Sequence, residues 1–143
     1  MIWTFFFSQY KFASKLVAED PKERKFLMIF GGSSVTAGHD NYFRESYPLV
    51  FERRMSPAFK VLGINLIVHN IAQGSNDCFP YNFCYEAMGG SNFDWIGWEQ
   101  SYNCGRDNGV FETIARVAAW GKAVMHYSAS GGFLPENCKP SKV

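Results

Sequence analysis

The chain has 143 residues, of which 47% are hydrophobic and 19% charged, with a formal net charge of +1. This length fits a single domain spanning residues 1–143, and the hydrophobic content excludes a disordered chain. The near balance of charge argues against nucleic acid or an acidic membrane surface as a partner. No apolar run approaches the roughly 20 residues that span a bilayer. The apolar start, residues 1–7, lacks the flanks of a signal peptide.

The first predicted elements are a short helix and a buried strand. Residues 10–19 carry apolar side chains on one side, and Asp20-Pro21 ends this helix because the residue before a proline is pushed out of the α region. The continuous apolar run 26–30 is flanked by charge and by Gly31-Gly32. It predicts a central strand that is covered on both faces.

Helices and strands continue to alternate after this strand. Tyr47 to Met55 predicts a helix capped by Ser46, and a separate helical stretch is expected between Pro57 and Gly63. The remaining expected elements are strands over 64–70, 94–99 and 123–127, an irregular and partly helical stretch over 78–90, and a helix from Asp107 or Asn108 to Gly121. Alternation of this kind predicts an α/β sandwich with a parallel sheet and a core over 26–127. Ligands of such sheets bind at the carboxyl ends of the strands.

The loop after the first strand, Gly32-Ser33-Ser34-Val35-Thr36-Ala37-Gly38, is the first candidate site. It is not a phosphate-binding loop, because His39-Asp40 stands where Lys-Ser/Thr is required, and it lacks the dinucleotide fingerprint. One interpretation is a structural turn of small residues. The other is a nucleophilic serine on a tight turn, with backbone N–H groups and a helix amino end close to the attacked carbonyl.

This loop resembles the first block of the SGNH (GDSL-type) hydrolase family, Gly-Asp-Ser-x-x-x-Gly after the first strand. The resemblance places the nucleophile at Ser34, with Ser33 in place of the family aspartate. It implies a flavodoxin-like three-layer sandwich and hydrolysis of an ester through an acyl-serine intermediate, with no cofactor.

Two later loops fit the second and third blocks of the family. The resemblance implies that the backbone N–H of Gly74, or of Ser75, and the amide of Asn103 form an oxyanion hole. An amide can donate to a developing negative oxygen without quenching a base. Taken alone, an ordinary glycine turn and a turn asparagine explain these residues equally well.

The last block of the family, Asp-x-x-His, does not occur after Asn103, so no catalytic base is identified. His39, His69 and His126 are weak substitutes, and we expect none of them to bond to Ser34. The resemblance therefore predicts the front part of such a domain, without its last strand and helix. We expect weak activity on esters and self-association through an uncovered sheet edge.

The substrate implied by the resemblance is an O-acyl group on a carbohydrate or a small lipid-like ester. His39, Phe79 and Tyr102 are candidate substrate contacts. Glu99, near a strand end, is expected to be an ordinary paired carboxylate, with tuning of the site as the alternative. A ligand-binding domain without turnover and a phosphate- or sugar-binding α/β module remain alternatives.

The four cysteines show no zinc-site spacing, so no metal is expected. They are compatible with two disulfides in an oxidising compartment or with four thiols, and the compartment stays open. Their positions are Cys78, Cys84, Cys104 and Cys138.

Overall fold

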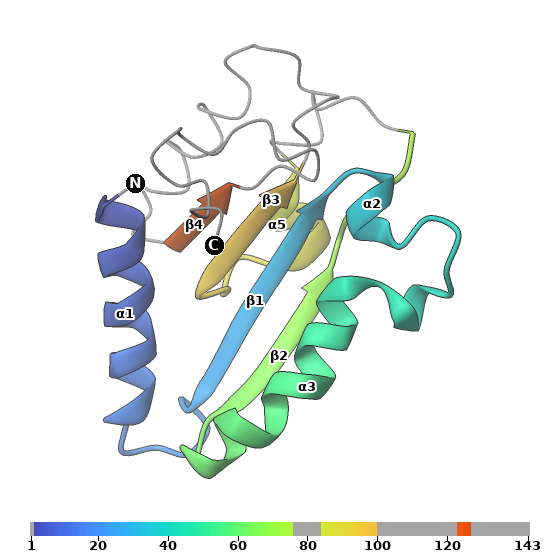
Figure 1. The fold of residues 1–143 in the computed structure, drawn as a ribbon. Helices are drawn as coiled ribbons and strands as arrows, with labels where there is room; N and C mark the ends of the chain where they lie inside the picture. The colour runs from blue at the N-terminus through green and yellow to red at the C-terminus, as the bar shows by residue number, and fades with distance from the viewer. Residues whose placement is uncertain (1, 76–83, 100–122, 127–143) are drawn as a thin grey trace, which may run out of the picture.

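A computed structural model describes residues 2–75, 84–99 and 123–126, which form an α/β fold around a parallel sheet (Figure 1). The four strands are β1 (Lys25–Gly32), β2 (Asn65–Asn70), β3 (Trp95–Glu99) and β4 (Ala123–His126). Their order in the sheet is β2-β1-β3-β4, and every neighbouring pair is parallel. This order is compatible with a flavodoxin-like layout. The predicted α/β class and parallel sheet are confirmed.

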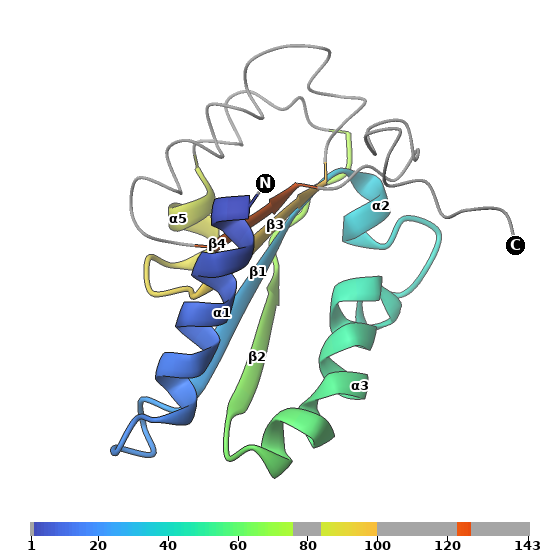
Figure 2. The same ribbon diagram turned by 60° about the vertical axis from the view of Figure 1, so that its left-hand side comes forward.

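Helices cover both faces of the sheet. They are α1 (Ile2–Leu16), α2 (Ser34–Ala37), the 3-10 helix η1 (Phe43–Glu45), α3 (Tyr47–Val61) and α5 (Tyr85–Gly89). The rotated view in Figure 2 shows that α3 and α5 lie on opposite sides of the sheet. The described elements therefore stack as helix, sheet and helix layers.

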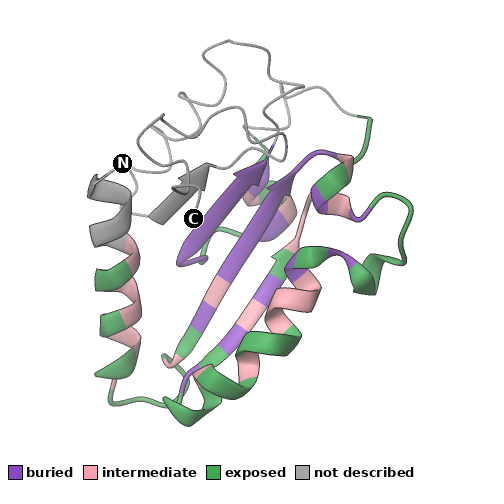
Figure 3. Ribbon diagram, viewed as in Figure 1, coloured by how far each residue is buried: buried purple, intermediate pink, exposed green. Residues whose placement is uncertain are grey.

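Alternate residues of β1 feed two separate hydrophobic clusters, as expected for a strand covered on both faces. Phe26, Met28 and Phe30 face α1 and α3, where Phe12 and Phe59 meet edge to face with ring centroids 5.4 Å apart. The opposite cluster contains Ile29 of β1 and Ile96 and Trp98 of β3, together with Tyr85 and Phe93. The purple colour of β1 and β3 in Figure 3 marks them as the most deeply buried strands shown.

The path of the chain reverses direction between β1 and β3. From β1 it crosses through α3 to β2 on one side, and it then returns past β1 to β3 on the other side. A reversal of this kind leaves a crevice outside the carboxyl ends of the two strands, and ligands of open α/β sheets bind there. Gly32, the last residue of β1, is paired in register with Glu99, the last residue of β3.

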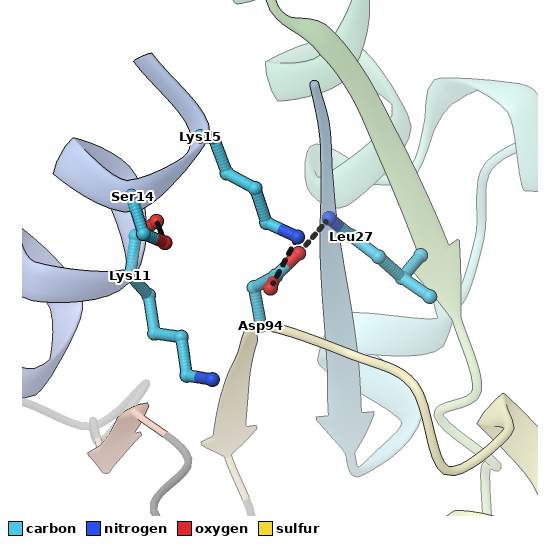
Figure 4. Close-up of polar contacts among 5 residues, drawn as sticks. All are labelled: Lys11, Ser14, Lys15, Leu27 and Asp94. Atoms are coloured by element: carbon cyan, nitrogen blue, oxygen red, sulfur yellow. Dashed lines mark hydrogen bonds and ion pairs between the residues drawn. The ribbon is translucent and has the colours of Figure 1, made fainter. Parts of the chain in front are cut away.

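The opposite, amino edge of the sheet is held by Asp94, a buried residue directly before β3 (Figure 4). One carboxylate oxygen lies 3.2 Å from the ammonium group of Lys15 on α1, and the other accepts from the backbone N–H of Leu27 at 3.0 Å. A solvent-open pocket of about 470 Å³ lies beside this pair, lined in part by Lys22 and Lys25. The pair fixes α1 to the edge that lies away from the serine loop.

Two predicted helix boundaries were wrong. The helix expected over 10–19 spans Ile2–Leu16, because the apolar start of the chain extends it. The predicted break at Pro57 is absent, and α3 runs through this residue. Phe51 and Phe59 lie on either side of Pro57 and pack against the same core cluster, so tertiary packing outweighs the local preference of proline. The helix expected up to Gly121 lies outside the described residues.

Candidate functional site

The serine loop is folded directly onto the end of β3. The backbone N–H of Ser33 donates to the carbonyl oxygen of Glu99 at 2.8 Å. Gly32 has a φ of +148°, and a Cβ built there would overlap that same carbonyl oxygen. Only glycine fits such a close approach of two backbones. Ser33 then begins α2 as its N-cap, with its hydroxyl oxygen accepting from the N–H of Val35 at 3.3 Å.

A buried carboxylate lies beneath this loop. Oε2 of Glu99 accepts from the hydroxyl of Ser33 at 2.7 Å and from the hydroxyl of Thr36 at 3.0 Å. Thr36 lies in turn 3.1 Å from the hydroxyl of Tyr47. Because the single proton of Thr36 is directed to Glu99, Tyr47 is the donor in that contact. The result is a chain of hydroxyl groups from α3 to the end of β3.

Glu99 differs from the ordinary paired carboxylate that was expected. Its side chain is fully buried, and in the part of the chain that the structure describes its partners are hydroxyl and N–H groups. Its second oxygen, Oε1, has no hydrogen-bond partner among the described residues. A buried carboxylate held by two hydroxyls at the switch point of the sheet is a feature that sequence reasoning missed.

The loop after β2 crosses the end of β1 and reaches Ser34. The N–H of Ile71 donates to the carbonyl of Phe30 at 2.8 Å, and the N–H of Gln73 donates to the carbonyl of Gly32 at 3.2 Å. Gly74 follows, and a Cβ built on it would lie 3.3 Å from Cβ of Ser34. Ser34 and Gly74 are therefore brought together from the ends of two strands.

Asn70, at the end of β2, fixes this loop with both ends of its side-chain amide. The nitrogen donates to the carbonyl of Thr36 at 2.8 Å and to the hydroxyl of Ser46 at 3.0 Å. The amide oxygen accepts from the N–H of Ala72 at 3.1 Å. These bonds join α2, the start of α3 and the loop that carries Gly74.

The other predicted site residues are placed as follows. Ser75, the alternative oxyanion donor, is exposed and has a positive φ of 61°. His39 is exposed, and its side chain lies 3.5 Å from a carboxylate oxygen of Asp40. His69 contacts the carbonyl of Gly89 at 3.3 Å. The predicted residues Phe79, Tyr102 and Asn103 lie outside the described residues, and His126 is described by its backbone alone.

The helix amino end expected near Ser34 belongs to a single helical turn that was not predicted from the sequence. α2 has four residues, Ser34–Ala37, and ends at Gly38 in the left-handed conformation. A single turn aligns few peptide dipoles, so a helix-dipole contribution at Ser34 is small.

No protein-family model matches the chain, and none of the curated proteins matches it. Within the described ranges, no three His, Cys, Asp or Glu side chains gather closely enough to hold a metal ion. In the same part of the chain, no helix combines the length and apolar character needed to cross a bilayer. Cys84 is exposed, and the other three cysteines lie outside the described residues.

Proposed function

We propose that this chain is a serine ester hydrolase of the SGNH type, with Ser34 as nucleophile. The observation that carries the proposal is the contact between Ser34 and Gly74 at the carboxyl edge of the sheet. The serine loop also lies at the switch point between β1 and β3, where α/β proteins bind their ligands. The finer fold proposed with it is the flavodoxin-like sandwich of that family.

The proposed chemistry is acyl transfer to the hydroxyl of Ser34. Its oxygen bonds to the ester carbonyl carbon, the bond to the alcohol oxygen breaks, and the alcohol leaves with the serine proton. Water then cleaves the acyl-serine and releases the acid. The N–H of Gly74 and the side chain of Asn103 are proposed to stabilise the negative oxygen of the intermediate. Substrates are O-acyl groups on carbohydrates or small lipid-like esters.

The expected rate is low because the sequence contains no Asp-x-x-His segment to deprotonate the serine. Among the described residues, the side chain of His39 lies beside Asp40, and that of His69 lies beside the carbonyl of Gly89. A serine hydroxyl is a poor nucleophile unless a base activates it, although oxyanion donors alone leave residual catalysis. This combination favours one second candidate, a domain of the same type that binds an ester or a sugar without turnover.

The deciding experiment is reaction with a fluorophosphonate probe, followed by mass spectrometry of the labelled peptide. We expect slow labelling at Ser34, complete loss in Ser34→Ala, and no change in Ser91→Ala, which alters an exposed serine elsewhere. Hydrolysis of a short-chain ester is measured in parallel. Labelling with hydrolysis supports the enzyme, and labelling without hydrolysis supports the binding domain. Labelling distributed over several surface serines would contradict both.

A further inference from the structure

Two buried acidic residues lie at the two ends of β3, and their surroundings differ. Asp94, before the amino end, has a cation and a backbone N–H as partners for its two oxygens. Glu99, at the carboxyl end, has two hydroxyl groups and one long backbone contact, Ser33 N–H at 3.4 Å, as its partners among the described residues, and all three reach the same oxygen. Asp94 is therefore explained by tying α1 to the sheet. Glu99 needs a different explanation, because burying a carboxylate is costly unless it is well bonded.

The contacts of Glu99 lie on both sides of Ser34 along the chain. Ser33 directly precedes Ser34, and Thr36 follows it within the single turn of α2. The hydroxyl of Ser33 is held as well by the N–H of Val35, so its rotation is fixed. Bonds to a carboxylate are shorter and roughly twice as strong as neutral ones. One carboxylate thus holds the backbone segment that carries the Ser34 hydroxyl.

We infer that Glu99 is the positioning residue for Ser34, and that it supplies from β3 the carboxylate that the Gly-Asp-Ser block carries inside the loop. This inference rests on the proposed function. Ser33 is fully buried and its hydroxyl lies 2.7 Å from Glu99. Two carboxylates at that separation would repel each other in a buried place. The site therefore has room for one carboxylate, either at position 33 or at position 99.

The inference is tested with Glu99→Gln, Ser33→Asp and the double variant Ser33→Asp/Glu99→Gln. Glu99→Gln keeps the shape of the side chain and weakens the bonds to Ser33 and Thr36. We expect it to slow fluorophosphonate labelling of Ser34 by a factor on the order of ten. Ser33→Asp alone is expected to slow labelling of Ser34 even more than Glu99→Gln does. In the double variant the new amide at position 99 can donate to the new carboxylate at position 33, and aspartate is as good an N-cap as serine. Labelling should therefore recover to within about threefold of wild type.

Amide hydrogen exchange provides a second readout that does not depend on chemistry at Ser34. The amides of Ser33, Ala37, Gly38 and His39 are all bonded in the loop. Their exchange should accelerate in Glu99→Gln and return toward wild type in the double variant. Asp94→Asn is the matched control, since it alters the other buried acid of β3. It should lower stability without changing either readout of the serine loop.

The outcomes separate this inference from the proposed function. If the amides respond as described but wild-type Ser34 never labels, the positioning role stands and the hydrolase proposal fails. If Ser34 labels and the loop ignores Glu99→Gln, the positioning role is wrong. If the losses in labelling rate add up in the double variant, the inference that a carboxylate at position 33 can replace the one at position 99 is also wrong. If Ser33→Asp does not fold, Ser33→Ala is used in its place. This variant removes one donor to Glu99, and its labelling and amide exchange are compared with those of wild type and Glu99→Gln.

Discussion

Gly74 lies against Ser34 so closely that a Cβ on the glycine would come within 3.3 Å of the serine Cβ. The two residues belong to loops that leave the carboxyl ends of β2 and β1. A side chain at position 74 would therefore press on the serine. In the proposed reaction the N–H of Gly74 faces the ester carbonyl, so this close approach bears on the reacting group.

Gly74→Ala should reduce labelling of Ser34 on the order of tenfold, because displacements of less than 1 Å at a reacting group are costly. Gly74 is exposed, so the free energy of unfolding should change by only about 0.5 kcal/mol. Labelling rates and urea unfolding measure the two effects. Gln73→Ala, an exposed neighbour in the same loop, is the control and should leave both near wild type. If wild type and Gly74→Ala were labelled at equal rates, Gly74 would not be part of the reactive site.

Asp94→Ala should lower the free energy of unfolding by about 1–3 kcal/mol, because the N–H of Leu27 loses its acceptor and Lys15 loses its counter-ion. Asp94→Asn keeps an oxygen for Leu27 and should cost less, about 1 kcal/mol. Urea unfolding of the two variants compares the contributions. Identical losses would mean that the ion pair, rather than the bond to Leu27, accounts for the stabilisation.

Pro57→Ala should raise the free energy of unfolding by about 1–3 kcal/mol. Pro57 is exposed within α3, has no N–H to donate, and its ring opposes the carbonyl one turn earlier. Thermal unfolding monitored by circular dichroism measures the gain. Ser56→Ala is the matched control in the same turn, since it removes the 2.6 Å bond to the carbonyl of Glu52. A Pro57→Ala protein no more stable than wild type would show that the surrounding helix has fully adapted to the proline.

Glu52→Ala should destabilise the chain by about 1 kcal/mol and increase self-association. Glu52 on α3 accepts from the N–H of Val68 at 2.8 Å, and β2 is an edge of the described sheet. Removing the acceptor exposes an unpaired donor on that edge. Sedimentation velocity and urea unfolding check the two effects, and Glu52→Gln, which keeps an acceptor oxygen, should behave like wild type. If Glu52→Ala remains as monomeric as Glu52→Gln, the carboxylate does not protect this edge.

The strands could be predicted because their signals are local. Each strand in the described sheet coincides with a strand expected from the sequence, and the apolar run over 26–30 correctly predicted that β1 is covered on both faces. Helix boundaries were less predictable. Whether Pro57 ends a helix depends on the core that its neighbours Phe51 and Phe59 pack against, and the sequence does not show that core.

The environment of Glu99 could not be predicted for a different reason. Its bond to Ser33 joins residues 66 positions apart, and its bond to Thr36 joins residues 63 positions apart. The sequence near Glu99 contains no pattern that predicts these bonds. The side-by-side placement of Ser34 and Gly74 follows from parallel strands, whose carboxyl ends meet at one edge. The strand order that places β3 beside β1, and so brings Glu99 under the serine loop, depends on the crossovers rather than on any one segment.

The buried bond between Ser33 and Glu99 also constrains how this sequence can drift over evolutionary time. If Glu99 positions Ser34 as proposed, a change from serine to aspartate at position 33 and the loss of the acid at position 99 are each expected to be harmful alone and tolerated together. Divergence through single substitutions must therefore pass through a chain with two acids or with none. Relatives of this protein should carry an acidic residue at one of the two positions and a neutral residue at the other, and the pair should change together.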